Sequence, residues 1–401
     1  MKALKAIAAG LLAVFLVGSA SAQSTTVHIT GSTAFRKATV IAIKNILQTG
    51  YTYGYIGSNA EGASRSVFSG TTKTTNLPVV IVCSWAGSTG GVQTVAQEDT
   101  INVATWLSAT GNALTTGGTA ISSDAAVYDA ASPADVAMSD SFQASSVAYG
   151  TGYTTLTDTV VGVVTFVWTK GKSSDSGVAA SLDNVTNITP LQAKLLLAAG
   201  LPMSMLTGNA ADSDYYVYPM GRDEDSGTRL SELSEAQFGV FNSPIQYQPT
   251  IASGEITAIA PWPAVTILGF NYPEGHSGYA SGGTLGTDLN NPVAASATDS
   301  FGSKFALIAY FGVNDATKVN NGNNNLMFNG VAYSDDAVRE GTYACWEYEH
   351  LMYRPTLSGN TKTVADQIAD QIINVDATQS GVLLSTMNVS KAVEGGVISH
   401  N

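Results

Sequence analysis

Charged residues are scarce in this sequence, and positive charges are the scarcest. Lys and Arg account for 18 of 401 residues against 31 Asp and Glu, which gives a net charge of −13. Charged residues make up 12% of the chain, where soluble domains carry roughly 25%. Because nucleic acid is held mainly by Lys and Arg on its phosphates, this balance argues against a nucleic-acid partner. The 44% of hydrophobic residues argues equally against an intrinsically disordered chain.

Cysteine is almost absent. Only Cys83 and Cys345 occur, too few for a disulfide scaffold, and without nearby His pairs they do not form a zinc site. Cys83 lies in the apolar run from Val79 to Trp85, where a buried cysteine packs as a small hydrophobe. An oxidising compartment would also permit a bridge between the two cysteines. The sequence leaves both states open.

The sequence has one secretion-like segment, at its start. Lys2 and Lys5 precede an uncharged run from Ala6 to Gly18, and an Ala-Ser-Ala triplet follows at 20–22. These are the three zones of a secretory signal. The run is too short to span a hydrocarbon core of roughly 30 Å, which favours a cleaved signal over a retained membrane anchor. We expect residues 1–22 to be removed after Ala22, and the mature chain to be periplasmic or secreted without membrane insertion.

Short β-like runs that lead into clusters of small polar residues recur along the chain, and their alternation with helical periods is typical of α/β folds. At roughly 100–200 residues per domain, the length predicts two domains. The four clusters are Gly31-Ser32-Thr33, Gly87 to Gly91, Ser139-Asp140 and Ser226-Gly227-Thr228.

Four further segments complete the expected frame. Val160 to Trp168 and Phe305 to Val313 are continuous apolar runs, and the first is long enough for a central strand or a crossing between two lobes. Thr189 to Gly200 has an N-cap, a proline at the first helical position and a terminal glycine, which together predict a helix. Val364 to Ile372 has the period of an amphipathic helix. Segments without a clear period are predicted to be insertions or surface loops: residues 98–134 and 280–300.

Small hydroxyl residues and glycines at a helix start indicate an anion site, since free N–H groups and the helix dipole there favour negative charge. Such residues are also ordinary N-caps, so one cluster alone indicates little. Three such clusters, with Arg222 four residues before Ser226, favour a tetrahedral oxyanion that a guanidinium grips with two parallel hydrogen bonds. Arg222 could also pair locally with the acids at 223–225, and both roles can hold together.

Asp140 is unexpected in an anion site, because its carboxylate repels an anion. The repulsion is relieved when the ligand carries a proton: a protonated phosphate can donate an O–H bond to Asp140, whereas ionised sulfate cannot. The alternative role for Asp140 is an N-cap or turn residue after a strand.

At these residues the chain resembles the substrate-binding proteins of phosphate ABC transporters, a family with a two-lobed type II periplasmic-binding fold. The resemblance implies that the first serine of the second loop contacts phosphate and that Asp140 accepts the phosphate proton. Roughly 45 residues separate that loop from Ser139, far more than is usual in the family. The similar segments are Thr30 to Phe35, Gly87 to Val92, Ala137 to Asp140, Arg222 to Thr228, Ala306 to Tyr310 and Gly341 to Tyr343.

We therefore expect an α/β protein of two lobes, each a mixed sheet flanked by helices. The first lobe is expected to comprise residues 23–163 and 309–401, and the second residues 164–308. Inorganic phosphate would bind between them. The expected ligand-binding residues are Ser32, Thr33, Ser88, Asp140, Arg222, Ser226, Gly227 and Thr228.

The expected function is capture of phosphate by a monomeric, non-enzymatic protein without metal or cofactor. The resemblance implies uptake through an ABC permease, although docking surfaces leave no short motif and the sequence leaves the permease open. Two alternatives stay open. One is the same fold tuned for another oxyanion or a phosphorylated organic ligand, and the other is a surface structural or adhesive protein that reuses the scaffold.

Other patterns are weaker. The segment Gly275 to Gly278 fails as a nucleophile elbow because Tyr279 takes the place of the final glycine, and we interpret it as a glycine-rich helix start. The histidines lack i, i+4 pairs, so no transition-metal site is expected: His28, His276, His350 and His400. A group of acids lacks the glycine-spaced loop of calcium hands and is predicted to form a solvated acidic face: Asp212, Asp214, Asp223, Glu224 and Asp225.

Overall fold

The computed structural model describes residues 24–98, 105–267 and 270–401. The predicted signal peptide, residues 1–22, lies outside these ranges. In the described part of the chain, no helix combines the length and the apolar character needed to cross a membrane.

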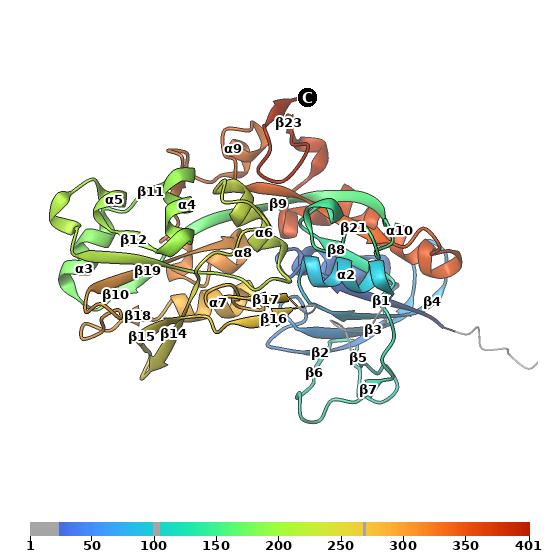
Figure 1. The fold of residues 1–401 in the computed structure, drawn as a ribbon. Helices are drawn as coiled ribbons and strands as arrows, with labels where there is room; N and C mark the ends of the chain where they lie inside the picture. The colour runs from blue at the N-terminus through green and yellow to red at the C-terminus, as the bar shows by residue number, and fades with distance from the viewer. Residues whose placement is uncertain (1–23, 99–104, 268–269) are drawn as a thin grey trace, which may run out of the picture.

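A mixed sheet of twelve strands, counted over the described residues, runs through both halves of the molecule (Figure 1). The strand order is β12-β13-β19-β9-β21-β8-β1-β4-β3-β2-β6, with β22 paired to β9. The strands are β1 (Thr25–Gly31), β2 (Thr52–Ile56), β3 (Arg65–Thr71), β4 (Pro78–Ser84), β6 (Thr119–Ala120), β8 (Val136–Ser139), β9 (Thr157–Lys170), β12 (Leu201–Pro202), β13 (Tyr215–Met220), β19 (Lys304–Gly312), β21 (Trp346–Tyr353) and β22 (Gly381–Val382).

Smaller sheets flank the main one. A four-stranded sheet has the order β10-β18-β15-β14, and the remaining strands form pairs. Their bounds are β10 (Lys172–Ser173), β14 (Tyr247–Ala252), β15 (Glu255–Pro261), β18 (Pro292–Val293), β5 (Trp106–Leu107) with β7 (Tyr128–Asp129), β11 (Asn187–Ile188) with β20 (Met327–Phe328), β16 (Val265–Ile267) with β17 (Phe270–Tyr272), and β23 (Val389–Ser390) with β24 (Ser399–His400).

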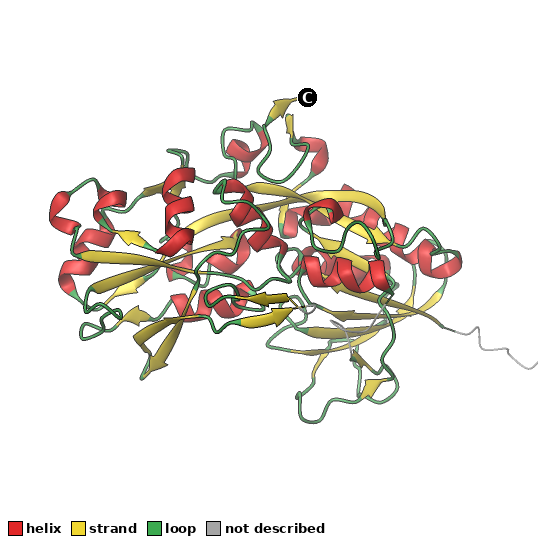
Figure 2. Ribbon diagram, in the orientation of Figure 1, coloured by secondary structure: helices red, strands yellow, loops and turns green. Residues whose placement is uncertain are grey.

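Helices lie on both faces of the main sheet (Figure 2). Their bounds are α1 (Arg36–Ile46), α2 (Ser88–Gln97), α3 (Ser176–Asp183), α4 (Pro190–Ala199), α5 (Ser204–Thr207), α6 (Gly227–Glu235), α7 (Gly282–Leu289), α8 (Val313–Ala316), α9 (Asp335–Arg339) and α10 (Gly359–Asn374). The predicted helices at 189–200 and 364–372 are confirmed as α4 and α10. Helix α4 has a complete capping box at Thr189 and Gln192, and Gly200 ends it with φ of 78°.

Strand β9 joins the two halves of the sheet. Its first part, from Thr157 to Thr165, pairs antiparallel with β21, and its last part, from Phe166 to Lys170, pairs antiparallel with β19. The residues from Val161 to Thr169 are all buried, as expected of a continuous β-branched run that is covered on both faces. The predicted crossing strand is therefore confirmed.

Two lobes lie at opposite ends of β9 (Figure 1). We call the part with β1 to β8, α1, α2 and α10 the first lobe, and the part with α3 to α7 and β10 to β18 the second lobe. The two-lobed α/β prediction is confirmed, with the added finding that the two lobes' main strands form one continuous sheet. The residue boundaries 163/164 and 308/309 stay a proposal.

Alternation along the strands divides the core of the first lobe. Ile81 and Cys83 of β4 point into the cluster that also holds the buried residues of α1 and α10, whereas Val82 points into the cluster beneath α2. Successive side chains of a strand face opposite sides of the sheet. Cys83 and Cys345 are both buried and free, and burial raises the pKa of the Cys83 thiol to about 12.

The two segments predicted to be loops are more ordered than expected. Segment 280–300 contains α7, which Ser281 caps and whose Leu285 and Leu289 are buried one turn apart. Residues 105–134 contribute β5, β6 and β7, and Trp106 is fully buried against the sheet. The loop prediction was therefore wrong for 280–300 and incomplete for 98–134, because abundant glycine hid elements that tertiary packing holds.

Candidate functional site

The candidate site lies where carboxyl ends of parallel strands from the two lobes meet. In the first lobe β1 runs parallel to β4 and to β8, so the loops that follow these strands share one edge of the sheet. They carry Ser32 and Thr33, Ser88, and Asp140 respectively. In the second lobe β13 runs parallel to β19. Arg222 and the start of α6 follow β13. Open α/β sheets commonly bind ligands at such edges.

Asp140 lies at a contact between the lobes. It is 1% exposed, the Ser88 hydroxyl donates to its Oδ1, and the Thr228 hydroxyl donates to its Oδ2 at 3.3 Å. Gly227 packs so closely that a Cβ there would collide with Oδ1 of Asp140. A carboxylate of the first lobe therefore lies against the N-terminal turn of a second-lobe helix, where the dipole favours negative charge.

Burial raises the pKa of the Asp140 carboxyl, and Ser88, Arg222 and Thr228 offset part of that rise. The cause is the cost of placing a charge in a medium of low polarity. Asp140 consequently holds a proton more readily than an exposed aspartate does. A carboxyl poised in this way can share one proton with an oxyanion that touches it.

The side chain of Arg222 is oriented by backbone carbonyls. It is 2% exposed, its Nε donates to the carbonyl of Tyr279 at 2.8 Å, and its Nη2 donates to that of Ala280 at 3.0 Å. Among the described residues it forms no ion pair with the acids at 223–225, although its charge lowers the pKa of Asp223 and Asp225 against the larger effect of their burial. The charge of Arg222 reaches Asp140, whose pKa it lowers.

The predicted solvated acidic face was wrong for four of its five members: Asp214 is exposed, but Asp212 is buried and the acids at 223–225 are only partly exposed. Burial raises the pKa of Asp223 to about 7 and that of Asp225 to about 6. Asp212 is also buried, and the hydroxyls of Ser181 and Thr207 each donate to its carboxylate at 2.6 Å. Asp223 and Asp225 are partly buried because the loop after Arg222 packs against the first lobe at α2, which composition does not indicate.

The backbone of Asp225 caps the first-lobe helix α2. Its carbonyl accepts from the N–H groups of Thr89 at 2.9 Å and Gly90 at 3.3 Å. Gly87, with φ of 85°, lies directly against the same carbonyl. This conformation and this contact both require glycine. The anion-binding end of α2 thus faces the second lobe.

The structure brings all eight predicted residues to this contact or its edge, but two of the hydroxyls have local roles. The Ser32 Oγ accepts from the N–H of Phe35 at 3.2 Å, and the Ser226 Oγ accepts from the N–H of Arg229 at 3.3 Å. Ser226 is the N-cap of α6, as the alternative interpretation held, whereas Ser32 closes the turn before α1, whose N-cap is Phe35. The buried Thr33 hydroxyl makes no hydrogen bond with any described residue. Ser88, Asp140, Arg222, Gly227 and Thr228 form the centre.

Arg36 and Glu349 also face this centre, although sequence reasoning missed them. Arg36 starts α1, its Nη1 donates to the Ala63 carbonyl at 3.1 Å, and its pKa is lowered by burial and by the nearby charge of Arg222, against an opposing effect of Asp315. Glu349 on β21 is fully buried, and burial together with Asp140 raises its pKa well above the ordinary value. The position of Arg36 directly after the first loop was an available signal. Glu349 left none.

Arg229 supports the loop that carries Arg222. It is fully buried, and its Nη1 donates to the carbonyls of Arg222 at 3.1 Å and His276 at 2.5 Å. The segment Gly275 to Gly278 is a loop that packs against Arg222, with Gly278 too close to its backbone to admit a Cβ. The predicted helix start at 275–278 was therefore wrong. The glycines instead allow the backbone of this loop to pack closely against Ile245 and Arg222.

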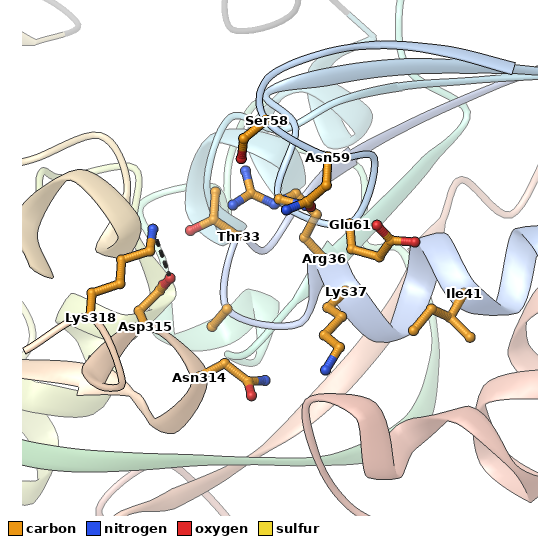
Figure 3. A pocket seen from close by; sticks show the side chains of 12 residues that line it. Thr33, Arg36, Lys37, Ile41, Ser58, Asn59, Glu61, Asn314, Asp315 and Lys318 are labelled. Carbon is orange, nitrogen blue, oxygen red and sulfur yellow. Dashed lines mark hydrogen bonds and ion pairs between the residues drawn. The ribbon is translucent and has the colours of Figure 1, made fainter. Parts of the chain in front are cut away.

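A polar cavity of about 620 Å³ opens beside Thr33, between the first turn of α1 and α8 (Figure 3). Arg36, Lys37 and Lys318 are among its lining residues. In the described ranges, no group of three His, Cys, Asp or Glu residues is placed to hold a metal ion.

Solved structures with a similar course of the chain include phosphate receptors, whereas no family model and no curated protein sequence matches. One is described as a phosphate ABC transporter substrate-binding protein with bound phosphate from Clostridium perfringens, with 12% identity, a TM-score of 0.45, and coverage of 90% of this chain and 99% of that one.

Two more belong to the same group. An ABC-type phosphate transport receptor from Vibrio cholerae has 12% identity and a TM-score of 0.44, over 89% of this chain and 99% of that one. PstS from Borrelia burgdorferi has 12% identity and a TM-score of 0.38, over 90% and 98%. At these TM-scores the ligand must be argued from the site itself.

Proposed function

We propose that this protein captures a protonated phosphate between its two lobes and performs no chemistry on it. The observation that carries the proposal is the buried Asp140 carboxyl, held between Ser88 of one lobe and Thr228 of the other. Phosphate bound here would replace part of the direct contact between the lobes and touch both of them. A ligand that contacts both lobes favours the closed arrangement.

In this proposal, each group has a task set by its chemistry. Arg222 and the N-terminal ends of α2 and α6 compensate the phosphate charge, and the hydroxyls of Thr33, Ser88 and Thr228 donate to its oxygens. Ser32, Ser226 and Gly227 contribute backbone N–H groups, and their small size lets the backbone lie close to the phosphate. Asp140 accepts the phosphate proton, which selects phosphate over sulfate.

The hydroxyls of the site support binding without catalysis. Those of Ser88 and Thr228 donate to Asp140, while that of Ser226 caps α6 and that of Ser32 accepts from the N–H of Phe35 in the turn before α1. In the described part of the chain none of these four is hydrogen-bonded to a histidine, the usual base for activating a serine. We further propose secretion through residues 1–22, a monomeric mature protein, and delivery of phosphate to an ABC permease.

The decisive experiment is calorimetry with Asp140→Asn. The mature wild-type protein is expected to bind phosphate and to show no binding of sulfate at the same concentration. An asparagine can donate a hydrogen bond to sulfate but loses the charged acceptor for the phosphate proton. We expect phosphate affinity to fall about 30-fold or more and sulfate binding to appear. Equal binding of the two anions by the wild-type protein, or no phosphate binding, would contradict the proposal.

A further inference from the structure

The polar cavity beside Thr33 is too large for inorganic phosphate alone. Its volume is about 620 Å³, within the range of roughly 300–1,000 Å³ that small organic ligands occupy. One wall is the first turn of α1 with the loop between β2 and β3, and the other is α8 with the turn after it (Figure 3). Thr33 belongs both to this wall and to the predicted phosphate loop. The cavity therefore adjoins the loop that carries Thr33.

Positive charge is in excess on these walls, in a protein whose net charge is −13. Of the two lining acids, Glu61 pairs with Lys44 at 2.5 Å, and Asp315 pairs with Lys318 at 4.0 Å. Arg36 and Lys37 remain, and neither forms an ion pair with any described carboxylate. Figure 3 shows the Lys37 side chain extended toward Asn314 across the cavity.

Arg36 is the stronger indication of an anion. It is 9% exposed, its Nη1 is held by the Ala63 carbonyl, and its buried Nε has no hydrogen-bond partner among the described residues. A buried guanidinium without a carboxylate partner is costly unless an anion compensates it. Neutral groups that can bind ligand oxygens surround it: Thr33, Ser58, Asn59 and Asn314.

We propose that this cavity binds the second anionic group of a phosphate-bearing ligand, a carboxylate or a second phosphate. The proposal rests on the proposed function, since the first phosphate group occupies the site at Asp140 and Arg222. Arg36 lines the cavity and is near enough to Arg222 for that charge to lower its pKa, and Lys37 and Lys318 also line the cavity. The preferred ligand is thus a small phosphorylated acid or a condensed phosphate rather than inorganic phosphate.

Four probes test this by calorimetry on the mature protein: inorganic phosphate, glycerol 3-phosphate, 3-phosphoglycerate and pyrophosphate. Glycerol 3-phosphate and 3-phosphoglycerate form a matched pair, because they differ only by a hydroxymethyl group against a carboxylate. We expect 3-phosphoglycerate to bind about tenfold more tightly than glycerol 3-phosphate, as one additional charge-assisted contact provides. Pyrophosphate binding more tightly than inorganic phosphate would support the proposal with phosphate as the second group.

The outcomes separate the two proposals. If inorganic phosphate binds but neither probe with two anionic groups is preferred over its counterpart with one, the cavity proposal is overturned and the proposed function stands. If no phosphate compound binds, the proposed function fails and the cavity proposal fails with it.

Variants locate the second group. Lys37→Gln changes an exposed side chain. It should lower the affinity for the preferred probe with two anionic groups about fivefold, while changing the affinity for inorganic phosphate less than about twofold. Arg36→Lys keeps the positive charge but removes the forked guanidinium donor. It should lower the affinity for that probe more than the affinity for inorganic phosphate. Lys194→Gln, on the exposed side of α4, is the matched control and should change neither. Equal weakening of all ligands by Lys37→Gln would overturn the proposal.

Discussion

At the scale of single residues, the contact between Gly227 and Asp140 sets how close the lobes come. Gly227 is the first residue of α6, and a Cβ there would collide with Asp140 and press on Ser88. Glycine elsewhere in a helix weakens it relative to alanine. The requirement for glycine here is therefore one of space at the lobe contact.

Gly227→Ala should separate binding from stability. The added methyl group keeps α6 from approaching Asp140, so we expect phosphate affinity to fall about 100-fold or more. The melting temperature should stay within a few degrees of wild type, because alanine favours the helix itself. Calorimetry and thermal unfolding measure the two quantities. An affinity equal to wild type would show that the lobes need not approach this closely.

At the scale of elements, α6 and the loop from Gly275 to Tyr279 act as one unit. The loop provides the carbonyls that hold Arg222 and Arg229, and the His276 ring stacks on Tyr272 with centroids 3.9 Å apart. Burial and the charge of Arg229 lower the pKa of His276 to about 4. The folded protein therefore keeps this ring neutral.

This predicts a pH dependence with a defined sign. The unfolded chain takes up a proton at His276 below its ordinary pKa of about 6.5, whereas the folded chain does so only near 4. The contribution is present above pH 6.5 and is lost as the pH falls toward 4. Urea unfolding at pH 7 and pH 4.5 should show a smaller loss of stability in His276→Gln than in wild type. Identical losses would contradict a buried neutral histidine.

At the scale of the whole molecule, the segment from Met387 to Asn401 contacts both lobes and links them. Lys391 is buried, donates to Glu235 of α6 and to the carbonyl of Trp346 at 2.7 Å, and lies 3.8 Å from Glu347 of β21. Three residues on, Glu394 accepts from the N–H of Phe142 in the first lobe. One short segment thus ties α6 to the central sheet.

Lys391→Met should destabilise the protein by about 3–5 kcal/mol, because it leaves the buried Glu235 and Glu347 without a compensating charge. The midpoint of urea unfolding measures the effect. Adding Glu235→Gln and Glu347→Gln should restore part of the loss, since no unpaired charge then remains. The exposed Lys194→Met is the control and should change stability by less than about 0.5 kcal/mol. A Lys391→Met effect as small as this control would show that the buried charges are not coupled.

The sequence by itself determined the local features of this protein. Strand runs, helix caps such as Thr189, and small residues at helix starts depend on near neighbours in the chain, so periodicity and capping predicted the α/β alternation. The eight site residues came from the clusters of small residues, the chemistry of Asp140 and Arg222 and the family resemblance, and their role in binding stays a prediction. The glycine-rich helix α7 was not predicted, because its apolar periodicity is confined to Leu285 and Leu289.

Only the tertiary structure decided which groups share one space. It partly buried Asp223 and Asp225, placed the Asp225 carbonyl on α2, and brought Glu349 and Arg36 close to Asp140 and Arg222. It also merged the strands of both lobes into one sheet through β9. The physical reason is that burial, and the pKa shifts and charge pairings that burial causes, depend on segments far apart in the chain, which local pattern does not encode.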